Sequence, residues 1–168
     1  MTQEMKYHFD AEKGIICEEV TGDRCLILTK ARLLQIIQRL KDLFQSGANV
    51  IILEAFKAAG EQHIDEVPDE SKTNIGEFLV TAVQRFTEAG LGKIEIVKVK
   101  PETFEFTFRI RNNFFAEMPN GDATYCDCVA AFVSGMYKRL TRKAPDIKET
   151  KCLSKGDEYC EWRVKPAK

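Results

Sequence analysis

Residues 149–164 read ETKCLSKGDEYCEWRV, and this stretch constrains the fold more than any other part of the chain. β-prone residues flank Gly156, which predicts two strands joined by a tight turn. A hairpin that folds about Gly156 places Cys152 and Cys160 across from each other. Two sulfurs brought together in this way suit a soft or borderline metal, usually zinc. The predicted strands cover residues 146–151 and 159–165, with the turn at 154–157.

A second pair of cysteines, Cys126 and Cys128, lies at the start of a predicted helix over 123–142. Two positions apart in a helix means about 200° of rotation, so only one sulfur can face the hairpin. The strongest apolar stripe of this helix includes Cys128, which assigns Cys128 to the core and leaves Cys126 for the hairpin. An extended segment would instead put both sulfurs on one face. The stripe comprises Tyr125, Cys128, Val129, Phe132 and Met136.

Glu149 is the nearest carboxylate upstream of the hairpin sulfurs, three residues before Cys152. Residues three apart in a regular strand face opposite sides, so Glu149 can join the sulfurs only through a bend or bulge. His8 and His63 are the only histidines, and both are distant in sequence. Spacing alone therefore leaves three interpretations open: a metal site, buried structural thiols, or a disulfide.

Composition bounds the class of protein. The chain has 168 residues, 44% hydrophobic and 30% charged, and we expect residues 1–168 to form one domain. The net charge is -1 and the basic residues are dispersed, which argues against nucleic-acid binding. The N-terminal MTQEMKYHFD has no signal-like apolar segment, and no stretch is long enough for a membrane span. We therefore expect a cytoplasmic protein with reduced thiols.

The remaining elements predict an α+β protein with antiparallel strands and about four helices. A polar, acidic loop is expected at 61–73, after a helix that ends near Gly60. The other predicted elements are strands at 14–20, 24–29, 93–100 and 103–111 and helices at 29–45, 49–59 and 74–88.

The tail resembles the closing motif of the 4-vinyl-reductase domain family, also described as hydrocarbon-binding. That motif is a Glu-x-x-Cys element followed by a cysteine before an aromatic residue, here Glu149, Cys152, Cys160 and Trp162. The helix CDCVAAFVSGMY, from Cys126, is similar to the family's cysteine-led helix. In phenol-sensing bacterial regulators, whose sensor domain belongs to this family, the matching residues bind zinc. The resemblance thus implies a structural zinc, and a zinc-stapled hairpin, held by Cys126, Glu149, Cys152 and Cys160.

The resemblance extends more loosely to ANVIILEAFKAAGEQ at 48–62, GKIEIVKV at 92–99 and FTFRIRNNFFAE at 106–117. It implies a mixed α/β fold shared with subunits of the TRAPP trafficking complex. It also implies a homodimer and a buried pocket for a small hydrophobic or aromatic ligand. The aromatic residues that we place at this pocket are Phe78, Phe104, Phe106, Phe108, Phe114 and Phe115, with Phe86 as a further candidate. Ordinary core packing is the alternative for each of them.

Three functions compete at this point. The first is a binding or sensing domain for a small hydrophobic molecule, with zinc in a structural role. The second is an interaction or assembly subunit like the trafficking proteins. The third is a reductase acting on a vinyl or tetrapyrrole substrate. Four protein ligands would close the zinc shell to water, and no nucleotide-binding fingerprint is present, so we name no catalytic residue and expect a binding protein.

Overall fold

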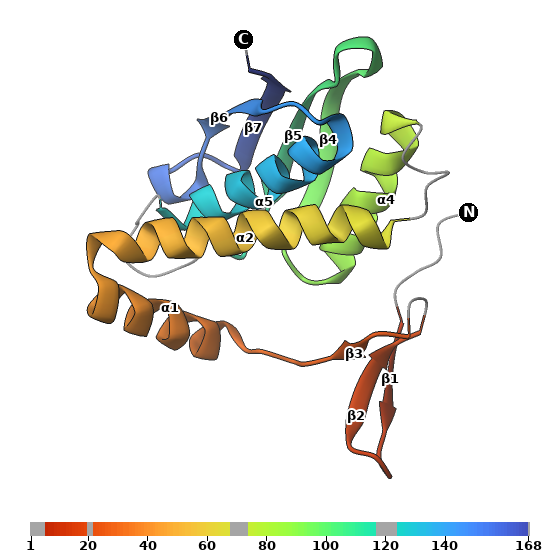
Figure 1. The fold of residues 1–168 in the computed structure, drawn as a ribbon, viewed down its shortest axis with the longest axis vertical. Helices are drawn as coiled ribbons and strands as arrows, with labels where there is room; N and C mark the ends of the chain where they lie inside the picture. Colours follow the sequence, from red (N-terminus) through yellow and green to blue (C-terminus); the bar gives the residue numbers. More distant parts are fainter. Residues whose placement is uncertain (1–5, 20–21, 68–73, 117–123, 168) are drawn as a thin grey trace.

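The computed structural model describes residues 6–19, 22–67, 74–116 and 124–167, and it shows a mixed α+β fold (Figure 1). The predicted class is confirmed: both sheets are antiparallel, and four α-helices lie in the described part of the chain. The helices are α1 (Lys30–Phe44), α2 (Ser46–Glu66), α4 (Ile75–Glu88) and α5 (Thr124–Thr141).

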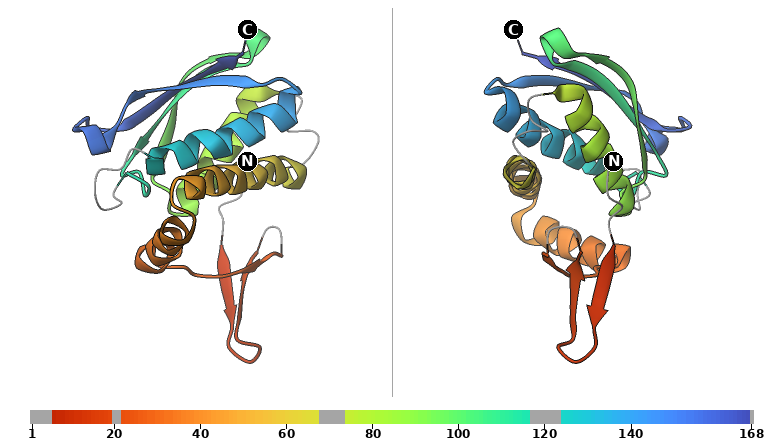
Figure 2. Two further views of the ribbon diagram at one scale, coloured as in Figure 1. Left: turned by 60° about the vertical axis from the view of Figure 1, so that its left-hand side comes forward. Right: turned by 90° about the vertical axis from the view of Figure 1, so that its right-hand side faces the viewer.

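A four-stranded sheet with the order β4-β5-β7-β6 forms one side of the main body. Its strands are β4 (Lys93–Lys100), β5 (Glu105–Arg111), β6 (Pro145–Lys151) and β7 (Cys160–Pro166). Phe106, Phe108 and Ile110 alternate along β5 and are buried, which marks the face that packs against helices. Figure 2 shows α4 and α5 against that face, α2 beyond α5, and α1 outermost.

Helix α2 corrects the prediction that a helix ends near Gly60, because α2 continues to Glu66. Gly60 lies against the backbone carbonyl of Phe132, and Gly135 lies against the carbonyl of Lys57. A Cβ atom at either glycine would overlap that carbonyl, so both glycines allow α2 and α5 to pack closely. The predicted loop at 61–73 is therefore helical as far as Glu66, and residues 68–73 lie outside the described residues.

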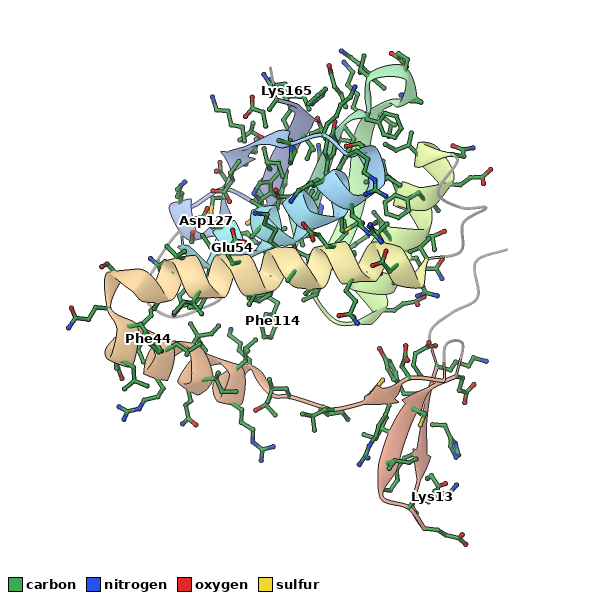
Figure 3. The ribbon with its side chains drawn as sticks, viewed as in Figure 1. Lys13, Phe44, Glu54, Phe114, Asp127 and Lys165 are labelled. Carbon is green, nitrogen blue, oxygen red and sulfur yellow. The ribbon has the colours of Figure 1, made fainter. Side chains whose placement is uncertain are left out.

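The N-terminal arm, residues 6–29, carries a three-stranded sheet that projects from the main body (Figure 1). Strand β1 (Tyr7–Asp10) was not predicted; it pairs with β2 (Ile15–Glu18), which pairs with β3 (Arg24–Cys25). The predicted strand at 24–29 is wrong after Cys25, because residues 26–29 have no strand partner. Figure 3 shows the arm's side chains spread away from the body, with Lys13 near the tip of the hairpin.

Candidate metal centre and apolar cavity

Four potential ligand groups from three elements converge beside the sheet. Cys126 lies in the first turn of α5, Glu149 in β6, Cys152 just after β6, and Cys160 at the start of β7. One ligand atom from each residue lies within 4.8 Å of all the others, and the three cysteines are buried. The Sγ atoms of Cys126 and Cys152 are 3.6 Å apart. Sulfurs around a tetrahedral zinc lie ~3.8 Å apart, given Zn–S bonds of ~2.3 Å, so this spacing fits a metal shell.

Glu149 reaches the sulfurs because strand β6 is irregular. The register between β6 and β7 shifts between Glu149 and Lys151, which supplies the bulge that the sequence spacing required. One carboxylate oxygen, Oε2, lies 3.3 Å from Nζ of Lys155. The other, Oε1, is buried and has no hydrogen-bond partner among the described residues. A buried carboxylate oxygen without a donor is costly, and a cation at the centre of the cluster would satisfy it.

The turn between the two hairpin cysteines is held by its own hydrogen bonds. A 3-10 turn at Leu153–Lys155 leads into Gly156, whose φ of 95° lies in the left-handed region that glycine tolerates. The N–H of Cys152 donates to Oδ2 of Asp157 at 2.8 Å, and the N–H of Leu153 donates to Sγ of Cys160 at 3.3 Å. The turn predicted about Gly156 is confirmed, and its backbone already points one donor at a ligand sulfur.

The three clustered thiols share protons unequally. A hydrogen bond from Cys126 lowers the pKa of Cys160 to about 6, and burial opposes this shift. The same bond, together with burial, raises the pKa of Cys126, and burial raises the pKa of Cys152. Near neutral pH the cluster thus holds one thiolate, and a bound dication would favour the deprotonated form of the other two sulfurs.

Cys128 points away from the cluster, as the helical-face argument predicted. It is buried in a separate group with Ile37, Ala48 and Tyr125, whereas Cys126 lies with Cys152 and Cys160. The alternative of an extended segment is excluded because Cys126 and Cys128 both lie in α5. The structure records all six cysteines as free thiols.

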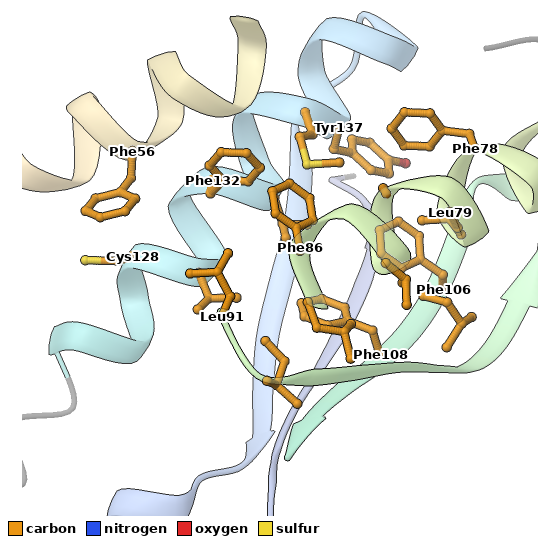
Figure 4. Close-up of a pocket in the computed structure, with 18 of the residues that line it drawn as sticks. Phe56, Phe78, Leu79, Phe86, Leu91, Phe106, Phe108, Cys128, Phe132 and Tyr137 are labelled. Atoms are coloured by element: carbon orange, nitrogen blue, oxygen red, sulfur yellow. The ribbon is translucent and has the colours of Figure 1, made fainter. Parts of the chain in front are cut away.

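A cavity of about 220 Å³ lies between the sheet and helices α2, α4 and α5 (Figure 4). Its wall is almost wholly apolar. Of the aromatic residues placed at a pocket from the sequence, Phe78, Phe86, Phe106, Phe108 and Phe115 line it. Phe104 and Phe114 are not among the lining residues; both are partly buried and pack against the two core clusters. Trp162 lies outside the cavity and stacks on Phe108 at 5.1 Å between ring centroids.

Sequence reasoning did not assign the helical half of this wall. Phe56 from α2 and Val129, Phe132, Met136 and Tyr137 from α5 all line the cavity. The apolar stripe of α5 was visible, but a stripe that lines a cavity has the same helical spacing as one that packs solidly. Nothing in that periodicity distinguishes the two.

Three polar side chains belong to the wall: Asn113, Cys128 and Tyr137. Nδ2 of Asn113 donates to Sγ of Cys126 at 3.9 Å, and Oδ1 accepts from the N–H of Phe115 at 3.1 Å. Burial raises the pKa of Cys128 to about 12 and also raises the pKa of Tyr137. The Tyr137 hydroxyl has no hydrogen-bond partner among the described residues.

The fold and these two features define a class of protein: an α+β module with a cluster of three thiols and a carboxylate beside an apolar cavity. Residues 106–166 match the model of the vinyl-4-reductase domain, so the resemblance to the 4-vinyl-reductase family is confirmed. An uncharacterized protein of Methanocaldococcus jannaschii is 29% identical over 120 residues, 71% of this chain and 65% of that protein. The match therefore spans less than two thirds of that relative's length.

Two solved structures share the fold. The phenol-responsive sensory domain of the transcription activator PoxR, crystallised with phenol, has a TM-score of 0.74 at 17% identity, over 95% of this chain and 84% of that chain. A trafficking protein particle complex subunit 3 from Naegleria fowleri, covalently bound to palmitic acid, has a TM-score of 0.58 at 13% identity, over 83% and 98% of the two chains. Among the residues that the structure describes, no helix has the length and apolar character needed to cross a bilayer.

Proposed function

We propose that this chain binds a small apolar or aromatic molecule in the cavity between the sheet and helices α2, α4 and α5. The observation that carries the proposal is the cavity itself, about 220 Å³ of space with an almost wholly apolar wall. Protein interiors are normally close-packed, and empty space of this size forfeits packing energy. A ligand that fills it would recover those contacts. The shared fold of the phenol-binding PoxR sensory domain supports the same class of ligand.

The size of the cavity limits the ligand. An engineered cavity on the order of 150 Å³ takes benzene, so this one suits a molecule of one or two rings or a short alkyl chain. Toluene and phenol are suitable probes. Each should raise the melting temperature of the purified protein in a concentration-dependent way, because a ligand of the folded state stabilises it by mass action.

Two variants of α4 make this test specific. Ala82 is buried in the cavity wall, whereas Val80 on the same helix is 58% exposed and does not line the cavity. Ala82→Leu should fill part of the cavity and weaken the response to toluene, and Val80→Leu should leave it unchanged. A response of equal size in both variants, or none in the unaltered protein, would contradict ligand binding in this cavity.

We further propose that Cys126, Glu149, Cys152 and Cys160 bind one zinc ion with a structural role. Three sulfurs and a carboxylate oxygen complete a tetrahedral shell and leave no position for a substrate or water. The partnerless Oε1 of Glu149 supports a cation at this place. Because the thiols must be reduced to bind metal, a reducing compartment, the cytosol, belongs to the same proposal.

Native mass spectrometry tests the metal directly, with one zinc per chain as the expected result. Cys152→Ser should lose the zinc and lower the melting temperature, since a structural metal contributes to folding free energy. Cys128→Ser is the matched control, because Cys128 is equally buried but outside the cluster. Zinc retained by Cys152→Ser at full occupancy would refute the assignment.

We also propose that the chain forms a homodimer through the N-terminal arm and the outer helices. Ten exposed large apolar side chains of the described residues lie between Tyr7 and Ile51, and Leu26 and Ile27 are 85% and 70% exposed. At ~100 Å² each they offer ~1,000 Å² per chain, which is comparable to the ~800 Å² per partner of a stable interface. Light scattering after gel filtration should give twice the chain mass. A monomer would instead favour the second candidate, an assembly subunit whose arm binds a different protein.

A further inference from the structure

Asn113 lies between the metal cluster and the cavity and touches both. It is 0% exposed and follows strand β5. Asn112, with a φ of 51°, turns the chain there. Nδ2 of Asn113 donates to Sγ of Cys126 at 3.9 Å, and the same residue belongs to the cavity wall. One buried carboxamide therefore contacts a ligand atom of the cluster and the space for the small molecule.

The segment after Asn113 makes the connection mechanical. Oδ1 of Asn113 accepts from the N–H of Phe115 at 3.1 Å, and the Phe115 ring meets the Phe56 ring edge-on at 5.4 Å. Both rings line the cavity. The N–H of Phe114 donates to the carbonyl of Leu91 at 3.1 Å, and Leu91 is also in the wall. Residues 113–115 thus form a short strip that carries a hydrogen bond to sulfur at one end and a wall aromatic at the other.

We propose that Asn113 couples the two sites, so that the small molecule and the metal each tighten the binding of the other. The inference rests on the proposed function, because it needs both sites to be used. A sulfur bound to a metal is a better hydrogen-bond acceptor than a thiol, so the metal fixes the Asn113 carboxamide. The fixed carboxamide holds the backbone of Phe115, and therefore one side of the cavity, in the conformation that a ligand contacts.

Coupling between two binding sites is reciprocal, which makes it measurable from the metal side alone. A ligand in the cavity should slow the release of zinc. A single buried hydrogen bond supports a change of about two- to tenfold, so we expect toluene to slow release by about fivefold. Asn113 is a positioning residue here, and its removal should abolish this ratio without preventing either ligand from binding.

The experiment uses the zinc-loaded full chain and a chromogenic chelator that reports zinc release, with and without saturating toluene. Asn113→Ala should release zinc at one rate in both conditions. Asn112→Gly is the control: it changes the exposed neighbour, keeps the positive φ accessible, and should retain the fivefold ratio. A ratio in Asn113→Ala equal to that of the unaltered protein would overturn the proposal.

Phe115→Leu decides the question if Asn113→Ala does not fold. This substitution leaves all four cluster residues and the Phe115 N–H in place but removes the ring contact with Phe56. Coupling through residues 113–115 predicts a ratio near one in this variant, and a ratio of fivefold would overturn it. Toluene that raises the melting temperature without changing zinc release would refute the coupling alone. Failure of toluene or zinc to bind at all would refute the proposed function together with it.

Discussion

The substitution Gly60→Ala tests the contact on which the cavity depends. Gly60 lies in the middle of α2, where its ideal Cβ would overlap the carbonyl oxygen of Phe132 and lie 3.2 Å from the backbone nitrogen of Met136. Both atoms belong to the backbone of α5, so no side-chain rotation can relieve the overlap. The two helices must move apart, and their residues Phe56 and Phe132 line the cavity. A single methyl group should therefore change both stability and ligand binding.

The expected magnitude follows from two opposing terms. Overpacking in a close contact costs about 1–3 kcal/mol. Replacing glycine by alanine inside a helix contributes about 1 kcal/mol in the other direction. The net destabilisation should be about 1–2 kcal/mol, which lowers the melting temperature of a chain of this length by roughly 2–8 °C. Gly47→Ala is the matched control in the same helix, because its Cβ would meet nothing within 4 Å. That variant should be stabilised by up to about 1 kcal/mol.

Thermal and urea unfolding of the three proteins would measure these changes, and toluene titrations would measure the effect on the cavity. Gly60→Ala should show a weaker toluene response than Gly47→Ala. The reasoning is refuted if Gly60→Ala is as stable as the unaltered chain, because the close approach of α2 and α5 would then be unimportant. It is also refuted if both alanine variants destabilise equally.

Three further predictions address other parts of the molecule. Tyr137→Phe removes a buried hydroxyl without a partner among the described residues, so the free energy of unfolding should stay equal or rise by about 1 kcal/mol; a clear loss of stability in urea would show that the hydroxyl is satisfied. Asp157→Ala removes the acceptor for the Cys152 N–H and should speed zinc release severalfold, whereas Glu158→Ala, on the exposed neighbour, should not; equal rates would contradict a role for this turn. Ile27→Lys should convert the proposed dimer to a monomer in sedimentation velocity while toluene binding persists, and an unchanged dimer would exclude Ile27 from the interface.

The cluster residues could be predicted from the sequence because their geometry is local. The turn about Gly156 and the 200° separation of Cys126 and Cys128 follow from the strand and helix alone. Glu149 was different: regular strand geometry argued against it, and only the family resemblance supplied it. The bulge between Glu149 and Lys151 removes that objection. A single irregular residue in β6 was therefore the part of this cluster that pattern reasoning could require but not locate.

The parts that could not be predicted depend on partners distant in sequence. Gly60 resembles a helix stop, and only the presence of α5 against it explains a glycine within a helix. Strand β1 has four residues, mostly exposed, and it forms because β2 lies beside it. The cavity has the same limit: Phe56, Phe106 and Phe132 have apolar patterns typical of a filled core. Whether three such side chains meet or leave a space between them is set by helix separation, which the sequence does not state.

Helix α5 gives the arrangement its logic, since its opposite faces serve the two sites. Cys126 faces the cluster, while Cys128, Val129 and Phe132 face the cavity. A metal bound at the first turn would restrict rotation of the whole helix, because Gly135 already holds its middle against the backbone of α2. Any rotation that moved the cavity face would also pull Cys126 from its partners. The metal would therefore fix the shape of the cavity without touching the ligand, which is why a structural zinc and a binding function are compatible in one small module.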